Sequence, residues 1–409
     1  MGNIRPIEPP ARGWTSRLRR ALSRETSTGQ FVPEIDGLRF VAIAAVILFH
    51  LDGYIGLRHV ERYGPLPSPS TIDSWMSKLV GVGAFGVQLF FAISGFILAL
   101  PFAHADLHHR PRPSLRRYFM RRVTRLEPPY IVNLLIWYPA QILLKGGTAL
   151  GLLPNLLASI FYLHVLIYGE RSRINQVTWT LEIEVQFYCL APLLTRVFQI
   201  RSTMWRRCLI AGVMLLLPVI QCSFLDLDSP YVMRTIVGNL QYFLAGFLLA
   251  DLFLVDWRRN PSLNFGWDFV GAASWILMLV VLNTSGNLFL FVTPFTIVLA
   301  YISAFRGPIS RRFFRAPAIV IIGGMCYTIY LYHWMCYFAL GPLTLRLYDP
   351  LRPHWVNFAI QSLTLVPLML VCCSVLFVLL EKPFMRPDWV DRALCALDWF
   401  KRKRGRQLR

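Results

Sequence analysis

The chain has 409 residues, of which 55% are hydrophobic and only 16% are charged, and its mean hydropathy is +0.48. Its 42 Lys and Arg residues against 22 Asp and Glu residues give a formal net charge of +20, which in a soluble protein would indicate nucleic-acid binding. Here most basic residues lie between long apolar runs, a pattern typical of a membrane protein whose cationic loops face the cytoplasmic leaflet. Nucleic-acid binding is therefore a poor interpretation.

Long apolar runs recur along the whole chain, and each is a candidate membrane span. They cover residues 38–57, 79–103, 126–145, 149–168, 178–199, 208–224, 231–254, 267–284, 287–305, 318–340 and 355–380. If all of them crossed, the basic loops at 201–207 and 311–315 would face outward, against the positive-inside rule. We therefore expect an all-α bundle of about ten transmembrane helices, with 149–168 re-entrant or peripheral.

This topology places both termini in the cytoplasm and the protein in the cytoplasmic (inner) membrane as a multi-pass chain. Residues 1–30 and 385–409 are predicted to be basic cytoplasmic tails around one membrane domain, 31–384. The eight cysteines show no CxxC pair and no spacing typical of zinc sites, so we expect neither a disulfide framework nor a bound metal.

Two ionisable residues, Arg39 and His50, lie in the first apolar run, where they are energetically costly. Their spacing of eleven residues places them on one helix face about 16 Å apart. The pair indicates a path from an aqueous surface to a buried reactive point. The alternative is a snorkelling arginine and a histidine hydrogen-bonded within the bundle.

Polar residues also occur in the next two stretches. Gln88 and Ser94 lie in the second helix, where small and polar residues more often serve close helix packing than chemistry. Arg122 and Arg125 precede the third helix and would share a face on its first turn. There each guanidinium could donate a pair of hydrogen bonds to a phosphate. The alternative is that these arginines only orient the helix relative to the cytoplasmic side of the membrane.

The fifth helix opens with Trp179 and carries Glu182 and Glu184, which lie about 200° apart and cannot face the same site. His333 is the unusual member of an aromatic tenth helix. Counted along their helices, His50, Glu184 and His333 all lie about 20 Å from the cytoplasmic edge. We therefore expect Glu184 beside His50, holding it as a general base.

These motifs, in this order, resemble acyltransferase family 3, a family of integral membrane O-acyltransferases. The blocks that carry the resemblance over about residues 31–384 are Asp36 to Arg39 with His50, Gly86 to Phe96, Arg122 with Arg125, Trp179 to Tyr188, Tyr327 to Trp334 and Glu381 to Pro383. Three positions depart from the family pattern: Phe40 replaces a glycine, Gln88 stands where an acid is common, and Glu182 replaces a frequent serine.

The resemblance implies that the co-substrate is an acyl-CoA donor, usually acetyl-CoA, and that the protein has no bound cofactor. It implies that His50 is the catalytic base or acyl relay, with Glu184 as the matching acid. Arg39, Arg122 and Arg125 would handle the donor. Asp36, Trp179, Glu182 and His333 belong to the same blocks and are expected to support the site.

The expected function is transfer of an acyl group to a hydroxyl of a carbohydrate or related acceptor of the cell envelope. The partners are then the bilayer, acyl-CoA and the acceptor. We expect the chain not to continue into the esterase-like extracytoplasmic domain that some members of the family carry. It would then deliver the acyl group to the acceptor itself or to a separate partner protein on the acceptor side. The alternatives are a transporter or flippase with an Arg/His/Glu path, and an inactive scaffold.

Overall fold

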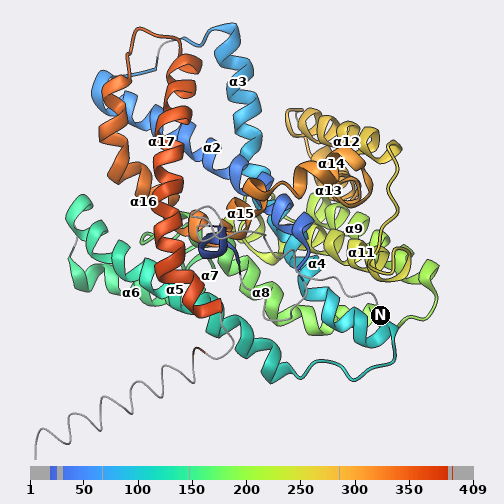
Figure 1. Cartoon of the computed structure of the whole chain (residues 1–409). Coiled ribbons are helices and arrows are strands. Elements are labelled where there is room, and N and C mark those ends of the chain that lie inside the picture. The colour runs from blue at the N-terminus through green and yellow to red at the C-terminus, as the bar shows by residue number, and fades with distance from the viewer. Residues whose placement is uncertain are drawn as a thin grey trace, which may run out of the picture.

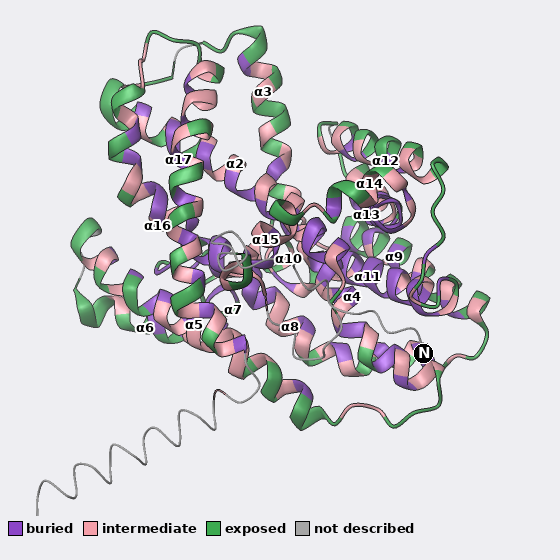
Figure 2. Cartoon of the chain, viewed as in Figure 1, coloured by how far each residue is buried: buried purple, intermediate pink, exposed green. Residues whose placement is uncertain are grey.

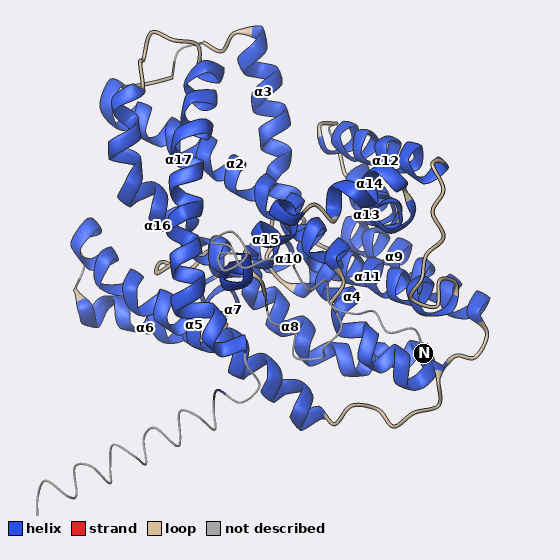
Figure 3. Ribbon diagram, viewed as in Figure 1, coloured by secondary structure: helices blue, strands red, loops and turns tan. Residues whose placement is uncertain are grey.

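The structure is a computed structural model that describes residues 19–24, 31–66, 68–146, 148–284, 286–385 and 389. Within these ranges the regular structure is entirely helical, with no strand, as Figure 1 and Figure 3 show. The predicted all-α class is therefore confirmed. The predicted tails, 1–30 and 385–409, lie largely outside the described residues.

Among the described residues, twelve helices have at least eleven residues and form the body of the structure. They are α2 (Pro33–Tyr63), α3 (Thr71–Gly81), α4 (Gly86–Leu107), α5 (Leu115–Lys145), α6 (Ala149–Ile160), α8 (Trp179–Leu194), α9 (Thr203–Phe224), α11 (Ile236–Val255), α12 (Gly266–Leu282), α13 (Leu288–Arg306), α16 (Cys326–Thr344) and α17 (His354–Leu376). Shorter helices join them: α7 (His164–Tyr168), α10 (Pro230–Met233), α14 (Pro308–Phe314) and α15 (Pro317–Gly324).

Several of these helices are long and apolar enough to cross a bilayer. Within the described residues there are 6 such segments, and up to 7 if α15 and α16, which meet at a bend of 73°, form one broken span. The chain is accordingly a multi-pass membrane protein. The count of about ten spans and the cytoplasmic position of both termini stay predictions.

The segment 149–168, which we expected to be re-entrant or peripheral, is not one continuous helix. It divides into α6 and α7 around Tyr162, whose φ is 57°. The 12 residues of α6 measure about 18 Å, well short of an apolar core of about 30 Å. This division agrees with the expectation that residues 149–168 do not cross the membrane as one helix.

Helix α17 shows the burial pattern of a membrane helix, with one face buried in the protein and the opposite face exposed. Its buried residues form a stripe with a spacing of four, consisting of Asn357, Gln361, Leu365, Met369 and Cys373. Large apolar side chains cover the opposite face, where Leu363 is 79% and Val371 is 65% exposed. Figure 2 shows this exposed side along the helix. Exposed leucine and valine over several turns are stable against lipid, not water.

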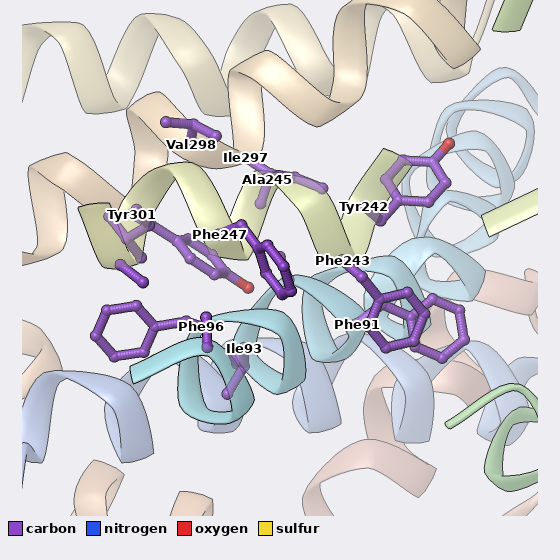
Figure 4. Packing of buried hydrophobic residues seen from close by; sticks show 14 of the residues in the cluster. Phe91, Ile93, Phe96, Tyr242, Phe243, Ala245, Phe247, Ile297, Val298 and Tyr301 are labelled. Carbon is purple, nitrogen blue, oxygen red and sulfur yellow. The ribbon is translucent and has the colours of Figure 1, made fainter. Parts of the chain in front are cut away.

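The core on one side of the molecule is built where α4 and α11 touch. Gly95 lies against the backbone of Phe243, and Gly246 lies against Ala92, so the two helix backbones meet with no room for a Cβ at either glycine. The rings of Phe91 and Phe243 stack beside this contact with centroids 4.7 Å apart. Figure 4 shows this packing, with α13 closing over it. Close backbone approach through small residues is how membrane helices gain dispersion contacts.

Helix α2 contributes residues to two separate hydrophobic cores. Its first half packs into the core of α4, α11 and α13 through residues such as Leu38 and Ala42, and its second half packs with α5, α16 and α17 through Leu51 and Ile55. Helix α15 also lies directly on α2, because Gly323 sits on the backbone of residue Asp36 where no side chain would fit. The helix that carries Arg39 and His50 is thus held from several sides.

A buried ion-pair network joins α9 to α11. Arg206 is 1% exposed and pairs with Asp251, which is 0% exposed and also accepts a hydrogen bond of 2.6 Å from Arg207. Arg207 also pairs with Asp256 at 2.6 Å. Two of the arginines that the sequence analysis counted as topology charges are therefore paired within the protein.

We predict that Arg206→Ala lowers the free energy of unfolding by about 3–5 kcal/mol, because Asp251 then keeps a buried charge with half of its partners removed. Chemical unfolding in detergent micelles measures this change. Arg201→Ala, at an exposed position of the preceding loop, is the matched control and changes stability little. Equal stability of the two variants would contradict the prediction.

Candidate active site

The centre of the site is a pair of histidines from two distant parts of the chain. His50 lies in α2 and His333 in α16, and Nδ1 of His50 is 2.9 Å from Nε2 of His333. Their rings stack with centroids 5.0 Å apart, and the ring of Trp334 stands edge-on to His50 at 5.5 Å. His333 is 0% exposed, whereas His50 is half-buried. His50 is therefore the member of the pair that is open to a substrate.

The surrounding hydrogen bonds assign the tautomer of each ring. Nδ1 of His333 lies 3.0 Å from the carbonyl oxygen of Ile329 and 2.9 Å from that of Tyr330. Carbonyl oxygens only accept, so Nδ1 of His333 carries the proton and its Nε2 accepts. Nδ1 of His50 must then donate to His333. This assignment leaves Nε2 of His50 with a free lone pair, which is what a general base requires.

Near the start of α2, a second group of side chains surrounds Asp36. Arg39 pairs with Asp36 across one helical turn, and Arg24 pairs with the same carboxylate at 3.0 Å. The charge of Arg125 acts on Arg24, Asp36 and Glu381. Asp36 thus partly neutralises a group of arginines that three separate segments bring together.

Arg122 lies on the same helix as Arg125. Its guanidinium lies 3.6 Å from the ring centroid of Tyr118 and 5.6 Å from that of Tyr188, and it donates to the carbonyl of Tyr118 at 2.7 Å. Nε of Arg122, Nε of Arg125 and Nε of Arg24 are all buried and have no hydrogen-bond partner among the described residues. We call Arg24, Arg39, Arg122 and Arg125 the basic cluster. It retains donor capacity that the described residues do not use.

The expected contact between Glu184 and His50 is wrong. Glu184 instead accepts a hydrogen bond from Ser94 of α4, and the charge of Arg122 acts on it. The residue beside His50 is His333. The error has a physical reason: a depth count places residues at one level, but it does not say which helix packs against which.

Glu182 and Glu184 do point in different directions, as their spacing predicted. Glu182 is 1% exposed, and one of its oxygens accepts from the backbone N–H of Val165 at 2.9 Å, which ties α7 to α8. Its other oxygen is buried without a partner in the described residues. Trp179 is half-buried and packs against the core of α4 and α11. Glu182 therefore ties α7 to α8, and Trp179 packs α8 onto the core.

The loop between α7 and α8 also packs beside the site. Asn175 donates to the side-chain oxygen of Asn133 at 2.8 Å and to the carbonyl of Leu331 at 3.3 Å. Asn133 donates to that carbonyl as well, at 3.0 Å. The hydroxyl of Tyr330 donates to the carbonyl of Val177, closing the contact from the other side. The loop is therefore fixed against the turn of α16 that carries His333.

Sequence reasoning missed Arg24 and Asn175. Arg24 lies in a basic stretch where every arginine looks alike, and the sequence offers no feature that separates it from its neighbours. Asn175 lies in a polar loop and gains its role from a contact 156 residues along the chain. Neither could be found without the tertiary structure.

The fold and the site together define a class: an all-helical, multi-pass membrane protein in which one helix, α2, carries a member of a hydrogen-bonded histidine pair and a member of a basic cluster. The family model described as "Acyltransferase domain" matches residues 32–378, which is most of the chain. The chain therefore belongs to this acyltransferase family, as its motifs indicated.

Comparison with curated proteins gives distant relatives of the same kind. A "Putative O-acetyltransferase" of Staphylococcus aureus (strain COL) is 24% identical over 90% of this chain and 59% of its own length. The "O-acetyltransferase OatA" of Staphylococcus aureus (strain NCTC 8325 / PS 47) is 22% identical over 75% of this chain and 50% of its own length. The chain thus spans between half and three fifths of the length of these relatives. No solved structure matches the chain significantly.

Proposed function

We propose that this protein is a membrane O-acyltransferase that moves an acyl group, preferentially acetyl, from acyl-CoA to a hydroxyl of a carbohydrate or related acceptor. Family membership and the names of the relatives support acyl transfer to oxygen. The observation that carries the proposal is the free Nε2 of His50, held in that tautomer by His333 and two backbone carbonyls.

In this proposal His50 acts as the general base. Its Nε2 takes the proton of the acceptor hydroxyl while the hydroxyl oxygen attacks the thioester carbonyl. A carbon–oxygen bond forms, the carbon–sulfur bond breaks, and the proton passes from His50 to the departing CoA thiolate. His333 stabilises the imidazolium that forms in between, because its Nε2 accepts from Nδ1 of His50.

The basic cluster is the proposed site for the phosphates of CoA. Arginine suits phosphate because its planar fork donates two parallel hydrogen bonds. Arg39 lies on the same helix as His50, about 16 Å away by helical rise, so a donor bound at the cluster would extend along α2 to reach the base. We place this cluster on the cytoplasmic side, where acyl-CoA is available, and the protein in the cytoplasmic membrane.

Glu184 has a revised role in this scheme. It lies next to Ser94 and within electrostatic reach of Arg122, so we propose that it positions the basic cluster and not the base. A transporter or flippase needs charged residues along a path but has no need for one histidine tautomer. The hydrogen bonds around His333 therefore favour catalysis over transport.

We predict that His50→Ala lowers the rate of acyl transfer by at least about a hundredfold, in line with the contribution of a general base. Release of CoA from acetyl-CoA by the purified protein in nanodiscs measures this rate. His59→Gln is a matched control on the same helix, where His59 contacts Tyr348 and not the histidine pair. Full activity of His50→Ala would exclude the proposed base.

We predict that Arg125→Gln raises KM for acetyl-CoA by about tenfold or more and changes kcat little, because one charge-assisted contact to a phosphate is lost. Arg116→Gln, an exposed arginine of the same helix, is the control and leaves KM unchanged. The steady-state kinetics of CoA release separate the two constants. An unchanged KM in Arg125→Gln would remove this residue from the donor site.

A further inference from the structure

Two arginines lie outside the basic cluster: Arg171 is in the loop that packs beside the turn of His333, and Arg234 directly follows α10, a helix that contacts α7. Arg171 is exposed in the loop after α7, the loop that Asn175 fixes against α16. Arg234 is half-buried and lies between α10 and α11. They come from segments that are far apart in the sequence and belong to none of the motifs of the sequence analysis.

Contacts between the two segments bring these arginines together. Helix α7 contacts α10, and the hydroxyl of Tyr231 lies 3.1 Å from the point where a Cβ of Gly169 would sit. Gly169 has a φ of +66°, which allows the chain to turn there into the loop. On the other side, the side-chain oxygen of Gln186 accepts from the backbone N–H of Ile236 at 2.8 Å, which fixes the start of α11 next to Arg234.

The hydrogen bonds of its loop place Arg171 near the turn of α16 that carries His333: Asn175 donates to the carbonyl of Leu331, and the hydroxyl of Tyr330 donates to the carbonyl of Val177. From there the charge of Arg171 acts on Arg234 and on His50. The arginines of the basic cluster instead act on Asp36, Glu184 and Glu381. Arg171 and Arg234 therefore form a second group of positive charge, separate from the basic cluster.

Among the described residues, no carboxylate lies within ion-pair distance of Arg171 or Arg234. Nearby Glu170 pairs with Arg173 at 2.7 Å, Glu182 accepts from the backbone of α7, and Glu184 accepts from Ser94. Across the ranges that the structure describes, the side chains of Arg171 and Arg234 make neither an ion pair nor a hydrogen bond. Nε2 of Gln186 is a third unused donor, buried beside the start of α11.

Two like charges that lie close together without a counter-ion repel each other, and an anion would relieve that repulsion. We propose that Arg171 and Arg234 bind an anionic group, a carboxylate or a phosphate, on the acyl acceptor. The acceptor hydroxyl is thereby placed at Nε2 of His50. This inference rests on the proposed function and adds the chemical class of the acceptor: a hydroxyl compound that carries a negative charge.

The test compares charged and neutral sugars of the same size. Glucuronate, glucose 1-phosphate and glucose are titrated into the full chain in nanodiscs, and their Kd values are measured by calorimetry. The double variant Arg171→Gln/Arg234→Gln is measured beside the wild type. Arg173→Gln, in the same loop but paired with Glu170, is the matched control. A ratio of Kd values within one variant does not depend on how much of the sample is folded.

We expect the wild type to bind the charged sugars between about tenfold and a hundredfold more tightly than glucose, as charge-assisted hydrogen bonds predict. The double variant loses this preference, and Arg173→Gln keeps it. Wild-type protein that binds glucose as tightly as the charged sugars would overturn the inference. So would a double variant that keeps the preference.

Two further experiments complete the test. The first distinguishes the possible sources of the anionic group, and the second tests the proposed function separately from the inference on the acceptor. Acetyl transfer to polyprenyl-phosphate-linked glucose, compared with glucose 1-phosphate, shows whether the anionic group belongs to a lipid carrier or to a free metabolite. Slow release of CoA by the wild type without acceptor, in which water takes the place of the acceptor hydroxyl and free acetate forms, tests the proposed function alone. If CoA is released but charged sugars have no advantage, only the inference on the acceptor fails.

Discussion

The hydrogen bond between His50 and His333 is the interaction on which the rest of this structure depends. Two neutral imidazoles can share one such bond only if one donates and the other accepts. The backbone carbonyls of α16 decide which ring does which, because they require the proton of His333 at Nδ1. A turn of helix backbone thereby sets the chemistry of a side chain on another helix.

The helix packing serves to keep these two rings together. Helix α2 lies between two cores, α15 is pressed onto its first turns at Gly323, and the chain bends by 73° before α16 begins. Glu381 accepts hydrogen bonds from the backbone and hydroxyl of Thr328 in the first turn of α16, at 3.1 and 2.5 Å. In lipid each polar group needs such a partner, so the same bonds that stabilise the helix also position His333.

The helical class, the reactive helix and most of the basic cluster could be predicted from the sequence, because hydropathy and helical spacing determine them. The partner of His50 could not. Periodicity gives the face of a helix but not its neighbour, so Glu184 and His333 looked equivalent at the same depth. Arg171, Arg234 and Asn175 lie in loops without periodicity, and only tertiary contacts bring them to the site.

The tautomer of His50 is the most direct test of this account. Nitrogen NMR of ring-labelled histidine in nanodiscs, with His50→Gln used to assign the resonance, reports which ring nitrogen carries the proton. The account predicts a protonated Nδ1 and a bare Nε2 in the wild type at neutral pH, and loss of this preference in His333→Ala. A proton on Nε2 of His50 in the wild type would contradict it.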